Sequence, residues 1–193
     1  MRRRTFDALM TVAGVILAAV LLVAGGLLTW AHAFVQDQVT TQLSAQQIQF
    51  PGKGSESLKD PAVEPYLSQY AGQQLTTGVQ AKAYADHYIA VHIEEMSGGK
   101  TYAQLSEESR ANPEDAELAG LVATVFKGET LRGLLLNAYA FWQMGTIALY
   151  GAIASFVGAG LMLLLSLLGL LHLRRVPATE EVRLGHGART ATA

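Results

Sequence analysis

Charged residues are missing from two long stretches of the chain, and this distribution predicts the architecture. No Asp, Glu, Lys or Arg lies between Asp7 and Asp37, or between Arg132 and Arg174. Each gap exceeds the roughly 20 apolar residues that a helix needs to cross a bilayer. A segment in lipid must satisfy its backbone polar groups internally, so both segments are expected to be helical. We predict transmembrane helices at residues 8–30 and 144–172.

Arginines flank the two segments on the sides that face the chain termini. Three precede the first segment at positions 2–4, and two follow the second at positions 174–175. Short flanks rich in Lys and Arg stay in the cytoplasm. Trp30 and Trp142, near the opposite ends, suit the headgroup layer. We therefore predict a multi-pass protein of the cell membrane with both termini cytoplasmic and residues 31–143 outside.

A cleaved signal peptide is the alternative to the first span. The apolar stretch is followed by Ala31-His32-Ala33, which has the small-x-small pattern of a cleavage site. Cleavage there would leave one span. The apolar stretch at residues 8–30 exceeds the roughly 7 to 15 residues of a signal h-region. This length favours an uncleaved anchor.

The first half of the central segment shows helical spacing interrupted by one loop. Val35, Val39 and Leu43 extend the first helix toward Phe50, and the three prolines within residues 51–65 predict a loop. A helix is predicted from Val79 to Met96 and ends at Gly98 and Gly99. Its apolar face contains Ala81, Ala85, Tyr88, Ile89, His92 and Met96.

The second half shows clear start signals for helices. Thr101 and Gln104 form a capping-box pattern, and Asn112 before Pro113 predicts the N-cap of the next helix. We expect a turn at Lys127 and Gly128. A final helix then begins near Glu129 and continues into the second span. Its apolar stripe contains Leu131, Leu134, Leu135, Ala138 and Trp142.

These elements predict an all-α protein in which two transmembrane helices flank an extracytoplasmic bundle of four or five helices. Residues 1–7 form a cytoplasmic N-terminus, and residues 173–193 lack apolar periodicity and are predicted to be a disordered cytoplasmic tail. There is no internal repeat and no sustained hydrophobic heptad. Small residues spaced by four in the spans favour close helix contact: Gly14 and Ala18, and Gly151, Ser155 and Ala159.

Charge and cysteine content exclude several function classes. Residues 31–143 carry 13 acidic and 7 basic side chains, so this segment does not favour nucleic acid or anionic lipid. The chain has no cysteine, and therefore neither a disulfide nor a thiol nucleophile. The spans contain no Asp, Glu, Lys or Arg, which argues against an ion path.

The histidines of the central segment are the candidates for chemistry. His87 and His92 are five residues apart, so a helix does not place them on one face as a metal pair requires. His87 is expected with Glu94 on the solvated face. His92 is expected to be buried beside Tyr88, either as a core histidine with a hydrogen-bond partner or as a ligand or proton site. Tyr88 and His92 are the ligand-binding candidates, and we predict no catalytic residue, metal or cofactor.

The sequence also resembles a known group of proteins. The stretches YAGQQLTTGVQAKAYADHYIAVHIEEMSGGKTYAQLS, FKGETLRGLLLNAYAF and VAGGLLTWAHAFVQDQV resemble a family of actinobacterial two-span membrane proteins of unknown function, sometimes labelled aromatic ring-opening dioxygenases. That label implies iron held by two histidines and a carboxylate. Such a site needs His32 or a partner chain in addition to His87 and His92.

Three functions remain in order of preference. The first is a non-enzymatic accessory or interaction protein of the cell envelope, with a membrane or envelope protein as partner. The second is a ligand-sensing membrane protein that acts through a partner, with an unknown ligand. The third is the iron-dependent dioxygenase.

Overall fold

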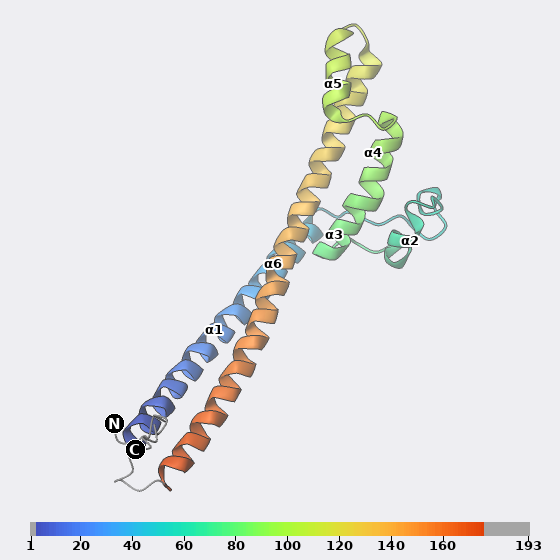
Figure 1. Cartoon of the computed structure of the whole chain (residues 1–193). Helices are drawn as coiled ribbons and strands as arrows, with labels where there is room; N and C mark the ends of the chain where they lie inside the picture. The colour runs from blue at the N-terminus through green and yellow to red at the C-terminus, as the bar shows by residue number, and fades with distance from the viewer. Residues whose placement is uncertain (1–2, 176–193) are drawn as a thin grey trace, which may run out of the picture. The chain divides into compact units, whose positions relative to one another are not determined.

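The structure, a computed structural model, describes residues 3–175, and the predicted all-α class is confirmed for this range (Figure 1). No β-strand occurs within it, although Gln49 and Gln74 form an isolated antiparallel bridge. The elements in chain order are α1 (Arg3–Ala45), η1 (Glu56–Leu58), α2 (Glu64–Leu67), η2 (Ser68–Tyr70), α3 (Gly78–Tyr84), the π-helical turn η3 (Ala85–Ile89), α4 (Ala90–Ser97), α5 (Tyr102–Ala111) and α6 (Ala116–Leu173).

Helices α1 and α6 are each long and apolar enough to cross a membrane. The described residues fall into two compact units, residues 3–30 with 149–175, and residues 31–148. The predicted boundaries of the cytoplasmic, spanning and outer segments stay predictions. The part of the predicted tail that follows Arg175 lies outside the described residues.

In the first unit, α1 and α6 run antiparallel and meet through small side chains. A Cβ atom added to Gly14 lies 2.5 Å from Ser166 Oγ, and one added to Gly169 lies 2.6 Å from Thr11 Oγ1. Ala18 is fully buried between the helices. Small residues permit such close approach because no side chain holds the backbones apart. The expected contact through Gly14 and Ala18 is therefore present.

This contact has a heptad spacing that the sequence analysis did not find. The α1 positions that face α6 alternate three and four residues apart, as in left-handed helix pairs. Hydropathy cannot show this pattern because nearly every position in the segment is apolar. The repeat is one of side-chain size and burial: Thr11, Gly14, Ala18, Leu21, Gly25 and Leu28.

The absence of native cysteines makes this register testable by disulfide formation. The Cβ atom built on Gly14 lies 3.8 Å from Ser166 Cβ, which is the mean separation in disulfides. We expect the G14C/S166C variant to form an intramolecular disulfide on mild oxidation, detected by peptide mass spectrometry. The control G14C/L167C moves one cysteine to an exposed position and stays reduced. Equal oxidation of both variants contradicts the register.

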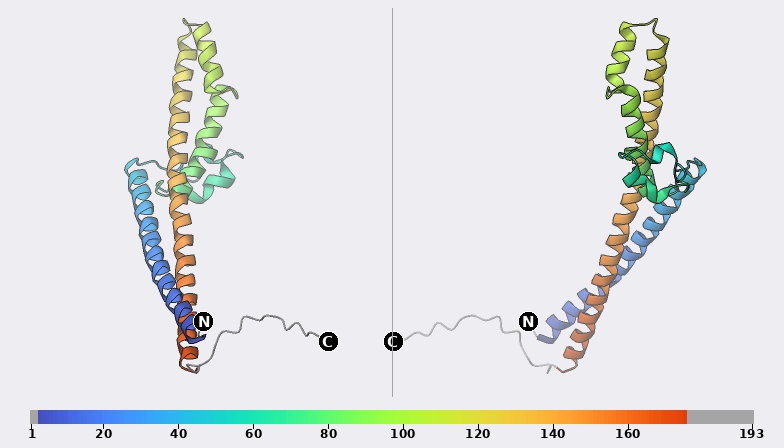
Figure 2. Two further views of the ribbon diagram at one scale, coloured as in Figure 1. Left: turned by 60° about the vertical axis from the view of Figure 1, so that its left-hand side comes forward. Right: turned by 90° about the vertical axis from the view of Figure 1, so that its right-hand side faces the viewer.

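The second unit, residues 31–148, has its own hydrophobic core. Helices α3 and α4 lie along α6, and α5 forms a hairpin with the start of α6, as two further views show (Figure 2). The predicted loop at residues 51–65 contributes to this core, because Leu58 in η1 and Val63 before α2 are buried. Helix α1 ends at Ala45, earlier than expected. The other buried core residues are Val39, Leu43, Phe50, Leu67, Leu75, Ala81, Ala85, Ile89, Ile93, Leu105, Val125 and Leu135.

The π turn η3 changes which face of the predicted helix at residues 79–96 is buried. A π turn holds one residue more than an α-helical turn, so it rotates the residues that follow it. Burial therefore continues through Ile89, Ile93 and Ser97, each four residues after the last. The predictions for His92 and Met96 were wrong: His92 is only half-buried and Met96 is exposed.

The predicted end of this helix and the next helix start are confirmed. Gly98 adopts a left-handed conformation with φ of 59° at the end of α4. Thr101 and Gln104 form the capping box that opens α5. Helix α3 opens with the same pattern at Thr77 and Gln80.

Helix α6 corrects two predictions. Its N-cap is Asp115, whose Oδ1 accepts from the Leu118 N–H at 2.9 Å. Asn112 instead ends α5, because its N–H and its Nδ2 both donate to the Glu108 carbonyl oxygen. There is also no turn at Gly128, where α6 continues unbroken. A Cβ atom at Gly128 lies 2.7 Å from Ile93 Cδ1, so this glycine allows α4 to approach.

Gly78 makes the tightest of these approaches and offers a stability test. A Cβ atom at Gly78 lies 2.3 Å from Trp142 Cβ, so Gly78→Ala forces α3 away from α6. We expect it to lower the free energy of unfolding by about 1–3 kcal/mol, as overpacking does. Gly120→Ala is the control, because nothing lies within 4 Å of its added Cβ. That variant is expected to gain roughly 0.5–1 kcal/mol from helix propensity. Thermal unfolding in detergent measures both, and equal effects contradict the packing.

Candidate functional site

The two predicted ligand-binding residues lie side by side on one helical segment. Tyr88 lies in η3 and His92 in α4, with ring centroids 4.3 Å apart. His92 Nδ1 lies 2.7 Å from the backbone carbonyl oxygen of Tyr88, so Nδ1–H donates a hydrogen bond to it. Both side chains are half-buried. The expected hydrogen-bond partner is thus present, although His92 is not a core residue, and the role of both residues in ligand binding stays a prediction.

His87 does not lie on a solvated face as expected. Its ring stacks on Tyr66, with centroids 3.5 Å apart and planes 4° from parallel. Tyr66 belongs to α2, so the stack joins this short helix to η3. The prediction of a solvated pair of His87 with Glu94 is therefore wrong. Helix α2 covers His87, and the helical spacing of residues 79–96 cannot show that contact.

An ion network fixes the π turn to α6. Asp86 accepts a hydrogen bond from Lys82 Nζ, and Arg132 Nη2 on α6 lies 3.4 Å from Asp86 Oδ1. Partial burial alone raises the pKa of Asp86, but hydrogen bonds and charges from Lys82 and Arg132 outweigh it and lower the pKa below its ordinary value. Nearby, burial and then Tyr88 raise the pKa of Tyr84 to about 12, so its hydroxyl is neutral at physiological pH.

The lowered pKa of Asp86 predicts a pH dependence of stability. A carboxylate with a depressed folded pKa stabilises the fold above its unfolded pKa of about 3.9, and this contribution is lost as pH falls through the folded pKa. We expect Asp86→Asn to lower the free energy of unfolding at pH 7 by about 1 kcal/mol. The difference from wild type should shrink on acidification below that unfolded pKa.

Thermal unfolding in detergent across this pH range checks the Asp86 prediction. Glu114→Gln is the matched control, because Glu114 is an exposed carboxylate before α6. A deficit of Asp86→Asn that persists unchanged in acid contradicts the ion pair as its cause.

The residues present do not fit an iron site. Within residues 3–175, no three His, Asp or Glu side chains converge as a metal-binding group. His32, which the dioxygenase label requires, instead binds α6 through its Nδ1, 2.8 Å from the Gly145 carbonyl oxygen. His92 binds within its own helix. The described part of the chain therefore does not assemble the two histidines and carboxylate of such an enzyme.

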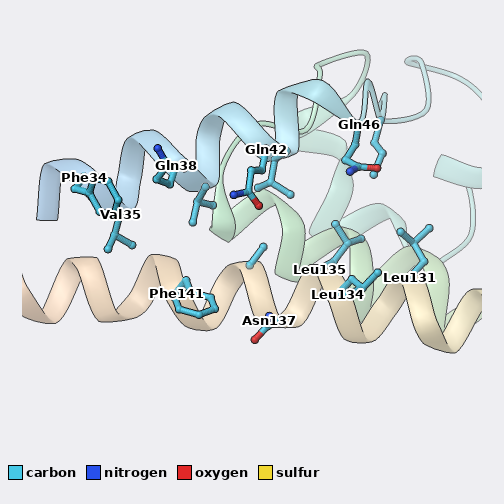
Figure 3. A pocket seen from close by; sticks show the side chains of 14 residues that line it. Phe34, Val35, Gln38, Gln42, Gln46, Leu131, Leu134, Leu135, Asn137 and Phe141 are labelled. Atoms are coloured by element: carbon cyan, nitrogen blue, oxygen red, sulfur yellow. The ribbon is translucent and has the colours of Figure 1, made fainter. Parts of the chain in front are cut away.

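A groove in the second unit is the larger candidate site. It has a volume of about 510 Å³ and lies between residues 34–48 and residues 131–141 of α6. In Figure 3, Gln38 and Gln42 of α1 and Gln46 of the turn that follows it lie opposite Leu131 and Phe141 of α6. The volume lies within the range of small-molecule sites in proteins. We refer to this feature as the α1–α6 groove.

The lining of the α1–α6 groove is apolar and uncharged. Val39, Leu43 and Leu135 are buried at its base. By contrast, Leu134 is 62% exposed and Phe141 is 49% exposed along its edge. None of its 14 lining residues is charged. Its polar groups are the side-chain amides of three glutamines and one asparagine, which can bind a partner without an ionic contact.

The sequence analysis missed this groove because the apolar stripe of α6 does not show which of its residues a neighbouring element covers. Leu131 and Leu134 belong to that stripe, but no element covers Leu134. The spacing of Gln38, Gln42 and Gln46 by four residues was the available signal. It places three amides on one helix face next to Val35, Val39 and Leu43.

No protein-family model, curated protein or solved structure matches the chain. The resemblance to actinobacterial two-span proteins therefore stays a prediction. The functional argument rests on the chain's own residues.

Proposed function

We propose that the protein is a membrane-anchored, non-enzymatic interaction module that binds another component of the cell membrane or envelope through the α1–α6 groove. In this proposal, residues 8–30 and 144–172 cross the cell membrane, residues 31–143 lie outside, and both termini are cytoplasmic. The arginine flanks support the orientation. The apolarity and length of α1 and α6 support the anchoring.

The exposed apolar edge of the groove is the observation that carries this proposal. A large aliphatic or aromatic side chain in water forgoes roughly 1.5–3 kcal/mol of burial energy. Leu134 and Phe141 are exposed on α6 beside a concave, uncharged surface. Apolar surface of this kind in an outer domain is typical of a binding site. An interaction function uses that surface directly, whereas the iron-dependent dioxygenase lacks a converging metal-binding group among the described residues.

Ligand sensing through a partner is the second candidate function. The observation that favours it is the π turn η3, since π turns occur frequently at functional sites. Tyr88 lies in this turn and His92 follows it. Substitution of Tyr88 and His92 separates the two functions. If binding is lost while the groove is unchanged, the binding site is at these residues and not at the groove.

Site-specific photo-cross-linking in the native membrane tests the groove as the binding surface. We expect benzoylphenylalanine at position 134 to give a defined adduct, identified by mass spectrometry. At position 130, an exposed α6 residue that does not line the groove, the same probe should give none. Ala138→Trp should remove the adduct because the indole fills the groove, and Ala140→Trp should not.

The two tryptophan variants are matched, because they place the same side chain two residues apart on α6. Ala138 lines the groove, and Ala140 is exposed and does not. The absence of any adduct at position 134, or equal adducts at positions 134 and 130, contradicts the proposed function.

A further inference from the structure

We propose that the α1–α6 groove holds a hydrocarbon chain of a lipid from the surrounding bilayer. This inference rests on the proposed function and names the component that the groove binds. The evidence is the charge of the lining, the size of the groove and the continuity of its walls with the two apolar segments.

The lining matches an uncharged, apolar occupant. Burial of a phosphate, carboxylate or ammonium group requires a counter-charge, and no lining residue supplies one. A methylene chain needs none and gains free energy from each group that leaves water. Val39, Leu43 and Leu135 offer a buried apolar base, and Leu134 and Phe141 extend it to the exposed edge. The glutamines of the opposite wall keep their amides available to water or to the ester region of a lipid.

The size of the groove favours a single chain over a protein helix. A helix is about 10 Å across and rises 1.5 Å per residue, so ten residues occupy roughly 1,200 Å³. The groove volume of about 510 Å³ is less than half of that. The groove thus covers at most one face of a helix, and its volume favours an occupant thinner than a helix, such as a single hydrocarbon chain.

Both walls of the groove continue the predicted spans without a break. Helix α1 runs unbroken from Arg3 to Ala45, and Phe34 lies four residues after Trp30. Helix α6 runs unbroken to Leu173, and Phe141 directly precedes Trp142. Tryptophans mark the membrane interface, so both walls of the groove begin within about one helical turn of the predicted interface. An acyl chain of a neighbouring lipid is therefore available at that end of the groove.

Lipid photo-cross-linking in vesicles tests this inference with the full-length protein. The vesicles contain phosphatidylethanolamine and phosphatidylglycerol, with a small fraction of phosphatidylethanolamine that carries a diazirine at the end of one acyl chain. After irradiation, peptide mass spectrometry maps the lipid adducts. We expect adducts in residues 38–46 and 131–141, in addition to those in the spans.

Two kinds of variant show whether the groove itself holds the chain. Ala138→Trp should lower the groove adducts at least about tenfold, since loss of burial for a few methylene groups changes affinity by that factor. Ala140→Trp should leave them unchanged. Leu134→Gln provides a second test on an exposed side chain, where a folding defect is not expected. Adducts within residues 8–30 serve as the internal control for insertion into the bilayer.

The outcomes separate this inference from the proposed function. Adducts confined to the spans, or groove adducts that Ala138→Trp and Ala140→Trp change equally, overturn the lipid inference. A protein adduct at position 134 in native membranes without a lipid adduct in the groove overturns it too, while the interaction function stands. If neither experiment gives an adduct at the groove, both proposals fail.

Discussion

Close approach to helix α6 is the constraint on which the packing of both units depends. In each unit, the tight contacts to this helix use a glycine on one side: Gly14 against Ser166, Gly169 against Thr11, Gly78 against Trp142, and Gly128 against Ile93. Helices meet at a distance set by the side chains between them. Without these glycines, neighbouring elements must move outward and the buried residues lose contacts.

This constraint also explains where the groove forms. The tight glycine contacts hold α3 and α4 against α6 at Gly78 and Gly128. Residues 34–48 have no such glycine between Gln38 and Gln46, and the buried residues there are Val39 and Leu43. Branched aliphatic side chains hold two helices further apart than glycines do. The groove is the space that this wider separation leaves.

Local signals in the sequence predicted local structure well. The capping box at Thr101 and the glycine end at Gly98 were correct because each depends only on residues within one turn. The predicted start of α6 was wrong because Asn112 could either begin that helix or end α5. In the structure its side chain bonds to the end of α5. The predicted turn at Gly128 was wrong for a related reason. The sequence does not distinguish a glycine that ends a helix from a glycine that lets another helix pack closely. The groove depends on which apolar residues remain uncovered, which no single segment specifies.

The π turn also has a consequence for how this chain can change in length. The buried positions through this segment, Ala81, Ala85, Ile89, Ile93 and Ser97, are each four residues apart, and on an uninterrupted α-helix this run would drift by about 160° around the axis. Removal of one residue from η3 shortens one of these intervals to three, as in the mixed intervals of three and four along one face of an ordinary helix. Insertion of a single residue into a helix whose two ends are held in place would produce a π turn of this kind. A deletion of one residue here can thus leave the same core buried.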